Sequence, residues 1–454
     1  MALQSGRWAR DPENGALYRT DRLIVRFRED ASAGRRALAL DLAGADRRTG
    51  ELWDGWQRAA VAERHSAMEA RARLRTDPAV DDVLLDYRAE PFATRPNDEF
   101  FARQWNFEML DLPRAWDVNN GATDQIVVAV VDTGLNVEGG TFTYDITGVG
   151  RVALPFAEAA DLVAPGRIVA PRDFVYGDDL PLDVDGHGTH VAGTIAQLTG
   201  NTVGVSGIAH KVKVMPIKVL AGAIDVLADP GNPGSLTTTI AAGIRYAADN
   251  GAHVINLSLG GPGASPLERD AIRYAVSRGA FVTIAAGNDG DAGNPIEYPA
   301  AYGSEIDGAM TVGAVGPDRR RASYSGFKPY VEVCAPGGDD RRSESDFDNG
   351  VSQMTYRSVD SWGFFSLLET FQLLRAGARP RFDRFAVTAY QGTSMAAPHI
   401  AGVGALLYSQ GIRNPAAIEE AITRFARPID ATADECGAGL VDPQGALRAL
   451  GITR

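Results

Sequence analysis

Residues 392–402 read Gly-Thr-Ser-Met-Ala-Ala-Pro-His-Ile-Ala-Gly. Small residues lead through Ser394 into an apolar, alanine-rich pattern that predicts a helix. Ser394 would lie at the N-terminus of that helix, where free backbone N–H groups and the helix dipole favour a developing negative charge. A Thr-Ser pair before a helix most often only caps it. Residues elsewhere in the chain must therefore decide whether Ser394 is a cap or a nucleophile.

Two blocks upstream supply the partners that a serine nucleophile needs. Asp132 ends the apolar run 127–131, which is typical of a buried strand. His187 stands between two glycines, directly before a helical pattern. Serine catalysis requires a base that takes the proton and a carboxylate that orients this base, so the order Asp132, His187, Ser394 indicates a nucleophilic serine. Zinc at His187 and His190 is disfavoured, because two histidines three residues apart do not complete a zinc site.

Apolar runs alternate with helical patterns through most of the chain. The runs lie at 126–131, 212–219, 254–259, 281–286, 310–315 and 331–335, and the helical patterns between them at 190–197, 238–249 and 267–278. This alternation predicts an α/β domain with a mostly parallel sheet flanked by helices. In such sheets, sites form at the carboxyl ends of the strands, where Asp132 stands.

The chain is expected to have three parts. Residues 1–20 are polar, carry turn signals and read as a flexible tail. Residues 21–95 predict a small α+β domain with helices on one face of an antiparallel sheet. Residues 96–454 form the main domain, with an insertion near 338–390. Its aromatic and aliphatic side chains either cover a core or form a partner surface; they are Phe364, Phe365, Leu367, Leu368 and Phe371.

Composition limits the possible partners. The chain has 454 residues and a formal net charge of −13, which argues against nucleic acid as a partner and is compatible with cation binding. No run approaches the roughly 18 apolar residues needed to span a membrane. Residues 1–10 lack the apolar segment of a signal peptide. Cys334 and Cys436 form either one bridge or two buried thiols.

Three blocks carry a family resemblance: Val-Asp-Thr-Gly at Asp132, Gly-His-Gly-Thr-His-Val-Ala-Gly at His187, and Gly-Thr-Ser-Met-Ala-Ala-Pro-His at Ser394. On these blocks, residues 96–454 resemble the subtilisin family of serine proteases. The resemblance implies a subtilisin-like fold and a serine endopeptidase that cuts extended polypeptides through a covalent acyl-enzyme. It also implies roles for four residues. Ser394 is the nucleophile, His187 the general base and then acid, and Asp132 the carboxylate that fixes the imidazole. Asn288 holds the oxyanion together with the N–H of Ser394.

The resemblance also suggests substrate contacts. Ser258, Leu259, Gly260 and Gly261 match the segment that pairs with the substrate backbone. Glu297 matches a position at the base of the first specificity pocket, where a carboxylate would favour Arg or Lys before the scissile bond, at P1. Asp185 would favour a basic residue at the next position. The alternative is that both acids are solvated surface groups.

A structural calcium site is a further implication of the resemblance. Asp98 and Asn201 would supply side-chain oxygens, and Leu198, Val203 and Val205 carbonyl oxygens, which suit calcium. The family's second carboxylate, just after the catalytic aspartate, is absent from this sequence. The site therefore either has one carboxylate fewer or receives one from another part of the chain.

The N-terminal domain resembles the family's propeptides, which assist folding and inhibit the protease as an intramolecular partner. The chain would then be an autoprocessing zymogen, cut between residues 92 and 107; an accessory domain is the alternative. We expect protein and peptide substrates, no organic cofactor and a monomer. The expected location is secreted or extracytoplasmic, and a cytoplasmic one stays open. A non-catalytic peptide-binding protein is disfavoured, because Asp132, His187, Asn288 and Ser394 are all present.

Overall fold

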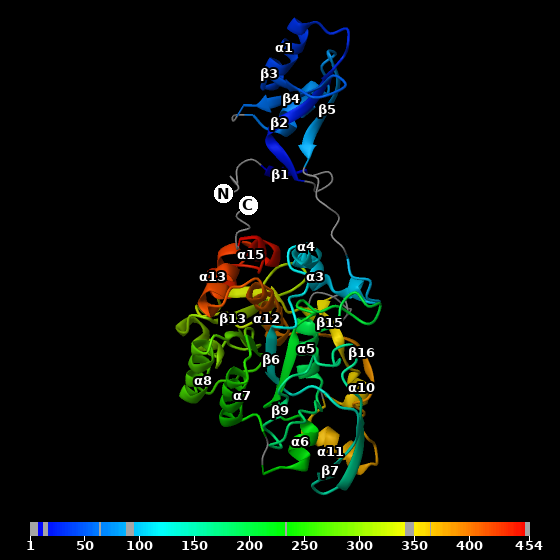
Figure 1. The fold of residues 1–454 in the computed structure, drawn as a ribbon, viewed down its shortest axis with the longest axis vertical. Helices are drawn as coiled ribbons and strands as arrows, with labels where there is room; N and C mark the ends of the chain where they lie inside the picture. The colour runs from blue at the N-terminus through cyan, green and yellow to red at the C-terminus, as the bar shows by residue number, and fades with distance from the viewer. Residues whose placement is uncertain are drawn as a thin grey trace. The chain divides into compact units, whose positions relative to one another are not determined.

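The computed structural model describes residues 8–11, 17–62, 65–87, 95–231, 234–340, 349–363 and 365–449. The chain divides into two units, Met1–Phe92 and Ala93–Arg454 (Figure 1).

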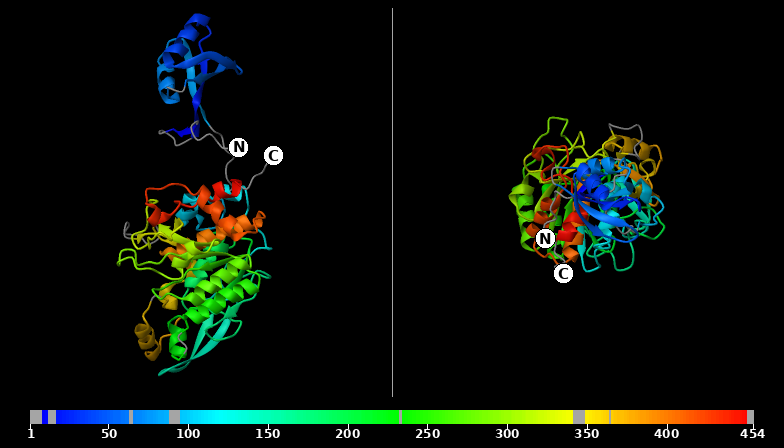
Figure 2. Two further views of the ribbon diagram at one scale, coloured as in Figure 1. Left: turned by 90° about the vertical axis from the view of Figure 1, so that its left-hand side faces the viewer. Right: turned by 90° about the horizontal axis from the view of Figure 1, so that it is seen from above.

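The N-terminal unit is an antiparallel sheet with two helices. The strand order is β1-β2-β4-β3, and β5 pairs with β2 on its other side. Helices α1 and α2 lie on one face of this sheet, over a core that includes Leu23, Val25 and Leu85 (Figure 2). This confirms the predicted α+β architecture. The elements are β1 (Trp8–Arg10), β2 (Leu17–Phe27), α1 (Ala33–Ala43), β3 (Ala45–Glu51), β4 (Trp56–Val61), α2 (Ala67–Leu74) and β5 (Val80–Tyr87).

Both helices begin where local chemistry directs them to. Ser32 and Ser66 are N-caps whose side chains accept hydrogen bonds from the backbone N–H of Arg35 and Glu69. Helix α1 ends at Gly44, which has a left-handed conformation that glycine adopts without strain.

The prediction of a flexible tail at residues 1–20 is wrong for residues 8–11 and 17–20, whereas residues 1–7 and 12–16 lie outside the described residues. This segment contains β1 and the first residues of β2, which pair with each other, and Tyr18 is buried in the core. A strand of three residues is too short to give a periodic pattern, which is why the sequence did not reveal it.

The main unit contains a seven-stranded sheet in the order β14-β13-β12-β11-β6-β10-β9, in which every pair is parallel. The predicted α/β fold is therefore confirmed. The strands are β6 (Val127–Asp132), β9 (Arg172–Asp173), β10 (Lys213–Lys218), β11 (Val254–Leu257), β12 (Phe281–Ala285), β13 (Ala309–Val315) and β14 (Val333–Pro336).

Helices cover both faces of this sheet (Figure 1). Helices α7 (Thr237–Asp249) and α8 (Pro266–Ser277) pack on one face; α5 (His187–Ala196), α12 (Thr393–Ser409) and α13 (Pro415–Phe425) pack on the other. In β6, Val128 and Val130 join the core of one face, and Ala129 and Val131 that of the other. Burial on both faces explains the continuous apolar run in the sequence.

Shorter elements complete this unit. Cys334 in β14 and Cys436 form a disulfide with a Cα–Cα distance of 5.0 Å, which decides between the bridge and the free thiols. The short elements are η1 (Phe101–Arg103), α3 (Trp105–Met109), α4 (Leu112–Trp116), η2 (Ala300–Glu305), α14 (Ala433–Cys436) and α15 (Pro443–Ala449).

A separate apolar core forms between segments that lie outside the sheet. It includes Val152, Ile224, Tyr356, Leu374 and Phe382. These residues come from the hairpin β7–β8, from β15, from helices α6 and α11 and from the loop before β16. The elements β7, α6 and α11 lie together at the lower end of the main unit in Figure 1. The elements are β7 (Gly140–Ile146), β8 (Gly150–Phe156), α6 (Ala223–Ala228), β15 (Val351–Tyr356), α10 (Ser358–Ser361), α11 (Leu367–Arg375) and β16 (Phe385–Tyr390).

The expected insertion near 338–390 is thus the hairpin β15–β16 with two helices at its tip. Phe371 packs against the separate core, whereas Leu367 and Leu368 are 44% and 63% exposed. The apolar residues of this insertion therefore divide between core and surface. Phe364, and residues 341–348 of the charged loop, lie outside the described residues.

Candidate active site

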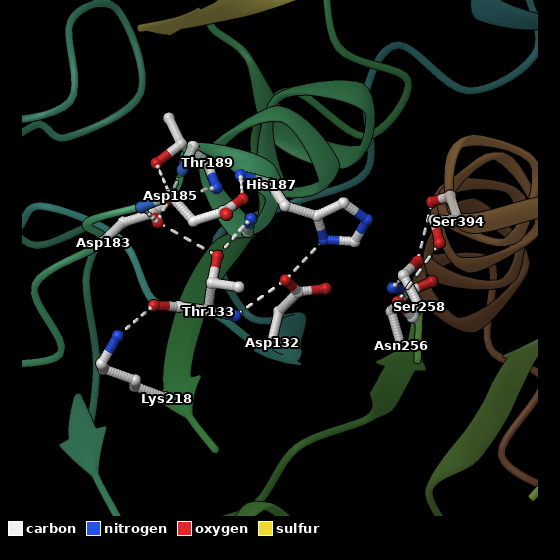
Figure 3. A network of polar contacts seen from close by, with 12 residues as sticks. Asp132, Thr133, Asp183, Asp185, His187, Thr189, Lys218, Asn256, Ser258 and Ser394 are labelled. Carbon is white, nitrogen blue, oxygen red and sulfur yellow. Dashed lines mark hydrogen bonds and ion pairs between the residues drawn. The ribbon is translucent and has the colours of Figure 1, made fainter. Parts of the chain in front are cut away.

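Three elements of the main unit bring Asp132, His187 and Ser394 together (Figure 3). Asp132 is the last residue of β6, His187 the first of α5, and Ser394 the second of α12. Asp132 is fully buried, and its Oδ1 lies 2.7 Å from Nδ1 of His187. The same oxygen accepts a hydrogen bond from the backbone N–H of Thr133 at 2.7 Å.

Ser394 and His187 line one cavity of about 330 Å³, together with Asn288. The Ser394 hydroxyl donates a hydrogen bond to the carbonyl oxygen of Ser258 at 3.3 Å. A nucleophilic serine must instead donate to the imidazole. Hydrogen bonds of catalytic groups are often long or misaligned without a substrate and tighten when the substrate binds.

Pro398 lies inside α12 and changes its hydrogen bonding. It is the sixth residue of α12 and not part of the first turn. A proline has no N–H, so it cannot bond the carbonyl oxygen of Ser394 four residues earlier. That oxygen instead accepts a hydrogen bond from the Ser258 hydroxyl at 2.8 Å. Pro398 therefore leaves the Ser394 carbonyl oxygen available for this hydrogen bond, which joins the start of α12 to the segment after β11.

Asn288 and Thr393 fix the geometry around the serine amide. Oδ1 of Asn288 accepts hydrogen bonds from the N–H and the hydroxyl of Thr393, at 2.9 and 3.0 Å. A Cβ on Gly392, whose φ is 147°, would lie 3.6 Å from both Nδ2 of Asn288 and N of Ser394. The two nitrogens therefore border the same small space. The sequence indicated Thr393 only as a possible helix cap. The structure shows that its hydroxyl bonds to Asn288 and so connects the start of α12 to this residue.

Asp183 and Thr133 are two further residues that sequence reasoning missed (Figure 3). Oδ1 of Asp183 accepts hydrogen bonds from the Thr133 hydroxyl at 3.0 Å and from the N–H of Gly186 at 2.8 Å. The Thr133 oxygen accepts a bond from the N–H of Gly188 at 2.8 Å. This network ties the loop before His187 to the residue after Asp132. Its members lie in the recognised blocks or beside them, but their pairing is long-range and leaves no local pattern.

The surroundings of His187 stabilise its charged form. Burial lowers the pKa of the imidazole, but the Asp132 carboxylate and the charges of Asp185 and Asp183 outweigh burial and raise the pKa to about 9. Burial, together with the charge of Asp183, also raises the pKa of Asp185 to about 6. Oδ1 of Asp185 accepts a hydrogen bond from the His187 N–H at 3.1 Å.

His190 makes structural contacts in the interior of the main unit. Its ring stacks on Tyr390 with a centroid distance of 4.4 Å, and its Nε2 lies 2.9 Å from the carbonyl oxygen of Val351. Burial lowers its pKa to about 3, so the ring stays neutral. Among the residues that the structure describes, no three His, Cys, Asp or Glu side chains are grouped to hold a metal.

The expected substrate segment, residues 258–261, lies beside Tyr298. Gly261 and Tyr298 exchange two backbone hydrogen bonds of 2.9 and 2.8 Å. Glu297 is 7% exposed, and burial and the neighbouring charge of Asp289 raise its pKa. A Cβ on Gly260 would lie 3.9 Å from Oε2 of Glu297. The carboxylate thus borders the expected substrate segment and is not a solvated surface group.

The expected calcium ligands gather around one loop. Buried Asp98 accepts hydrogen bonds from the N–H groups of Gly200 and Asn201 at 2.8 and 2.9 Å. Nδ2 of Asn201 donates to Oδ1 of Asp161 at 2.5 Å, and the Leu198 N–H donates to the carbonyl oxygen of Asp161 at 3.0 Å. Val203 is exposed and Val205 buried in the same loop.

Asp161 is a carboxylate that the sequence did not identify. It follows β8, in the segment inserted after Asp132, so its approach to Asn201 depends on the course of a long insertion. Burial raises its pKa, and the charge of Asp98 adds to this effect. Asp98 accepts a hydrogen bond from the backbone N–H of Asn201 and Asp161 accepts one from its side-chain amide, so two carboxylates lie beside this residue, and carboxylate oxygens are hard ligands that suit calcium. Nearby cationic charge would relieve their repulsion, so these residues fit the ion.

These features define a class of protein. A buried carboxylate paired with a histidine, a serine at a helix N-terminus and amide nitrogens beside it are the components of a serine hydrolase that acts by acyl transfer. Comparison with known proteins gives the family. The sequence profile of the Subtilase family matches residues 123–439. The chain belongs to this family and is a serine-type endopeptidase.

Individual relatives agree with this assignment. Thermitase of Thermoactinomyces vulgaris is 32% identical over 78% of this chain and 99% of its own. A thermophilic serine proteinase of Bacillus sp. (strain AK1) is 31% identical over 96% of this chain and 89% of its own. A protease of Pseudoalteromonas arctica whose structure is solved is 32% identical over 79% of this chain and all of its own, with a TM-score of 0.55.

Proposed function

We propose that Ser394, His187 and Asp132 form the catalytic triad of this endopeptidase. His187 would take the proton of Ser394 during attack and return it to the leaving amine, while Asp132 holds the imidazole orientation. The observation that carries this assignment is the 2.7 Å contact between buried Asp132 and Nδ1 of His187, which leaves Nε2 for the serine. Asn288 and the Ser394 N–H would donate to the oxyanion.

The test uses the full chain and its Ser394→Ala variant. Wild type should cleave an unfolded protein, and the variant should not. If both cleave it at equal rates, Ser394 is not the nucleophile. A Ser277→Ala variant, altered at the end of α8, serves as the matched control and should behave as wild type.

We also propose that the N-terminal unit is a propeptide, so that the chain is an autoprocessing zymogen. Its support is the separate α+β unit, Met1–Phe92, ahead of the family match. During incubation, the intact mass of wild type should fall to that of a fragment beginning between residues 92 and 107. Ser394→Ala should keep its full mass. If wild type cleaves added substrate but keeps its full mass, the N-terminal unit is an accessory domain and not a propeptide.

A preference for Arg or Lys at P1 is the specificity that we propose. This proposal is supported by the position of the Glu297 carboxylate beside Gly260 and by the burial of the Glu297 side chain. Matched peptides with Arg, Lys or Phe at P1 should show Arg and Lys cleaved faster. The preference should disappear in Glu297→Gln and weaken as the pH falls through the raised pKa of Glu297, because the protonated carboxyl is neutral. Equal cleavage of Arg and Phe peptides by wild type would rule out the role.

Asp185 is proposed to extend this preference to the position before P1. Asp185 lies two residues before His187 and is partly exposed. Its charge is one of those that raise the pKa of His187. Asp185→Asn should reduce the rate ratio between Arg and Gln at that position, at a pH well above 6. The same peptides with Glu297→Gln, in which that ratio should persist, separate the two acids.

We propose a structural calcium ion at Asp98, Asp161 and Asn201, with carbonyl oxygens from Leu198, Val203 and Val205. The ion would tie the loop after α5 to the segment after β8. Calcium at about 100 times its Kd should stabilise the folded protein by about 2.7 kcal/mol. Thermal unfolding of Ser394→Ala should therefore shift upward with calcium and downward with a chelator, and Asp161→Asn should abolish the shift. No shift in Ser394→Ala would exclude the ion.

A secreted or extracytoplasmic location is also proposed. The disulfide between Cys334 and Cys436 persists in oxidising compartments, and a relative in Xanthomonas campestris is an extracellular protease. Among the described residues, no helix is both long and apolar enough to cross a bilayer. Fractionation of the source cells tests the location; recovery of the protein with reduced cysteines in the cytoplasm would contradict it.

A further inference from the structure

The cavity beside Ser394 has a wall that the triad does not use. His187, Asn288 and Ser394 form one part of its lining, and Met395 adds to it. The other part comes from the two ends of the insertion and the residue that follows it, and consists of Asp340, Gly350, Ala389, Tyr390 and Gln391. At about 330 Å³, this cavity lies within the range of about 300–1,000 Å³ typical of ligand pockets.

The position of the cavity indicates which part of a substrate enters it. The chain before the scissile bond is expected against residues 258–261 and Glu297, and none of these lines the cavity. A peptide that crosses Ser394 must continue on the other side. His187, which would protonate the leaving amine, does line the cavity. The residue directly after the scissile bond, P1′, therefore has this space available.

Among the described residues of this wall, Asp340 carries a negative charge. Asp340 is exposed, and its backbone N–H donates a hydrogen bond to Oε1 of Gln391 at 2.9 Å. Gln391 directly precedes Gly392, so this bond joins the Asp340 loop to the start of the serine segment. Among the described residues that line the cavity, Asp340 is the only carboxylate, and His187 is the only base.

The neighbouring residue anchors the loop. Asp339 is buried, and Oδ2 of its carboxylate accepts a hydrogen bond from the Ser323 N–H at 3.0 Å. Its own N–H donates to the carbonyl oxygen of Asn349 at 3.3 Å. Asp340 thus stands between a buried anchor and the bond to Gln391, which limits its freedom to move away from the cavity.

We propose that Asp340 makes this cavity a subsite for a cationic side chain at P1′, so that Arg or Lys is favoured there over Glu. The proposal rests on the proposed catalytic role of Ser394. An ion pair with this exposed carboxylate favours the cation, and repulsion disfavours the anion. Together these effects should give a ratio of about tenfold between Arg and Glu at low salt, which falls as salt screens the charges.

The test compares peptides that differ only at P1′, with Arg, Gln or Glu, in competition for the same enzyme. Wild type should cleave the Arg peptide about ten times faster than the Glu peptide, as a ratio of kcat/KM. In Asp340→Asn, the ratio should fall to about one to two. Because both peptides compete for the same active molecules, partial misfolding of a variant cancels from the ratio. Asp270→Asn, on the exposed surface of α8, is the matched control and should keep the wild-type ratio.

A peptidyl anilide, which has no residue after the scissile bond, separates this inference from the catalytic assignment. If wild type does not hydrolyse the anilide, the proposed triad fails. If it hydrolyses the anilide but cleaves the Arg and Glu peptides equally, only the Asp340 subsite is overturned. A tenfold ratio that persists unchanged in Asp340→Asn also overturns it, since another group must then provide the preference.

Discussion

His187 is the residue whose environment most directly affects the rate. A general base must be neutral, and the surrounding carboxylates hold the pKa of His187 at about 9. We therefore predict that kcat/KM for a peptidyl anilide rises about tenfold per pH unit below this pKa and levels off above it. The sign follows from the protonated imidazole being inactive.

Asp185 provides the control for this pH profile. Its charge contributes to the raised pKa of His187, so the inflection in Asp185→Asn should lie at lower pH than in wild type. A wild-type inflection near pH 6.5 that does not move in the variant would mean that the carboxylates do not act on the base.

Asn288 should act as a donor, and its two side-chain atoms can be tested separately. Oδ1 already accepts hydrogen bonds from Thr393, whereas Nδ2 borders the space beside the Ser394 N–H. Asn288→Asp keeps an acceptor for Thr393 and removes the amide donor. We predict a loss of about 100- to 1000-fold in kcat, with little change in KM. Near wild-type kcat in this variant would exclude Asn288 from the oxyanion site.

At the level of elements, a buried ion pair joins β10 to α6. Nζ of Lys218 lies 2.8 Å from Oδ2 of Asp225 and donates to the Thr133 carbonyl oxygen at 2.9 Å, and both side chains are fully buried. Lys218→Met leaves Asp225 buried without its partner, which should cost about 3–5 kcal/mol. Urea unfolding in the Ser394→Ala background measures this. The double variant Lys218→Met, Asp225→Leu should recover much of the loss; equal stability of wild type and Lys218→Met would contradict the argument.

At the level of the whole molecule, the disulfide joins two positions 102 residues apart. Closing a loop of about 100 residues stabilises the fold by up to about 4.7 kcal/mol through the unfolded chain. We predict that replacing Cys334 and Cys436 by Ser lowers the free energy of unfolding by about 2–5 kcal/mol in the Ser394→Ala background. A reductant should lower it in the parent and not in the double-serine protein. No change on removal would show that the bridge carries no stability.

Much of the main unit could be predicted from its sequence because the evidence is local. Val128 and its neighbours in β6 are buried on both faces, which leaves a continuous apolar run, and Asp132, His187 and Ser394 each stand in an unbroken block. The separate core could not be predicted, since Val152, Ile224 and Phe382 meet only after three distant segments fold together. Asp161 and Asp183 were missed for the same reason. Each has its effect through a partner that is remote in the chain.

The central claim is that Ser394, activated by His187 and Asp132, is the nucleophile of this subtilase. Treating the protein with a fluorophosphonate and mapping the adduct by peptide mass spectrometry tests it most directly. One adduct should form, on Ser394, and its formation should be slower by about 1000-fold or more in His187→Ala. An adduct on a different serine, or equal labelling rates in wild type and His187→Ala, would contradict the claim.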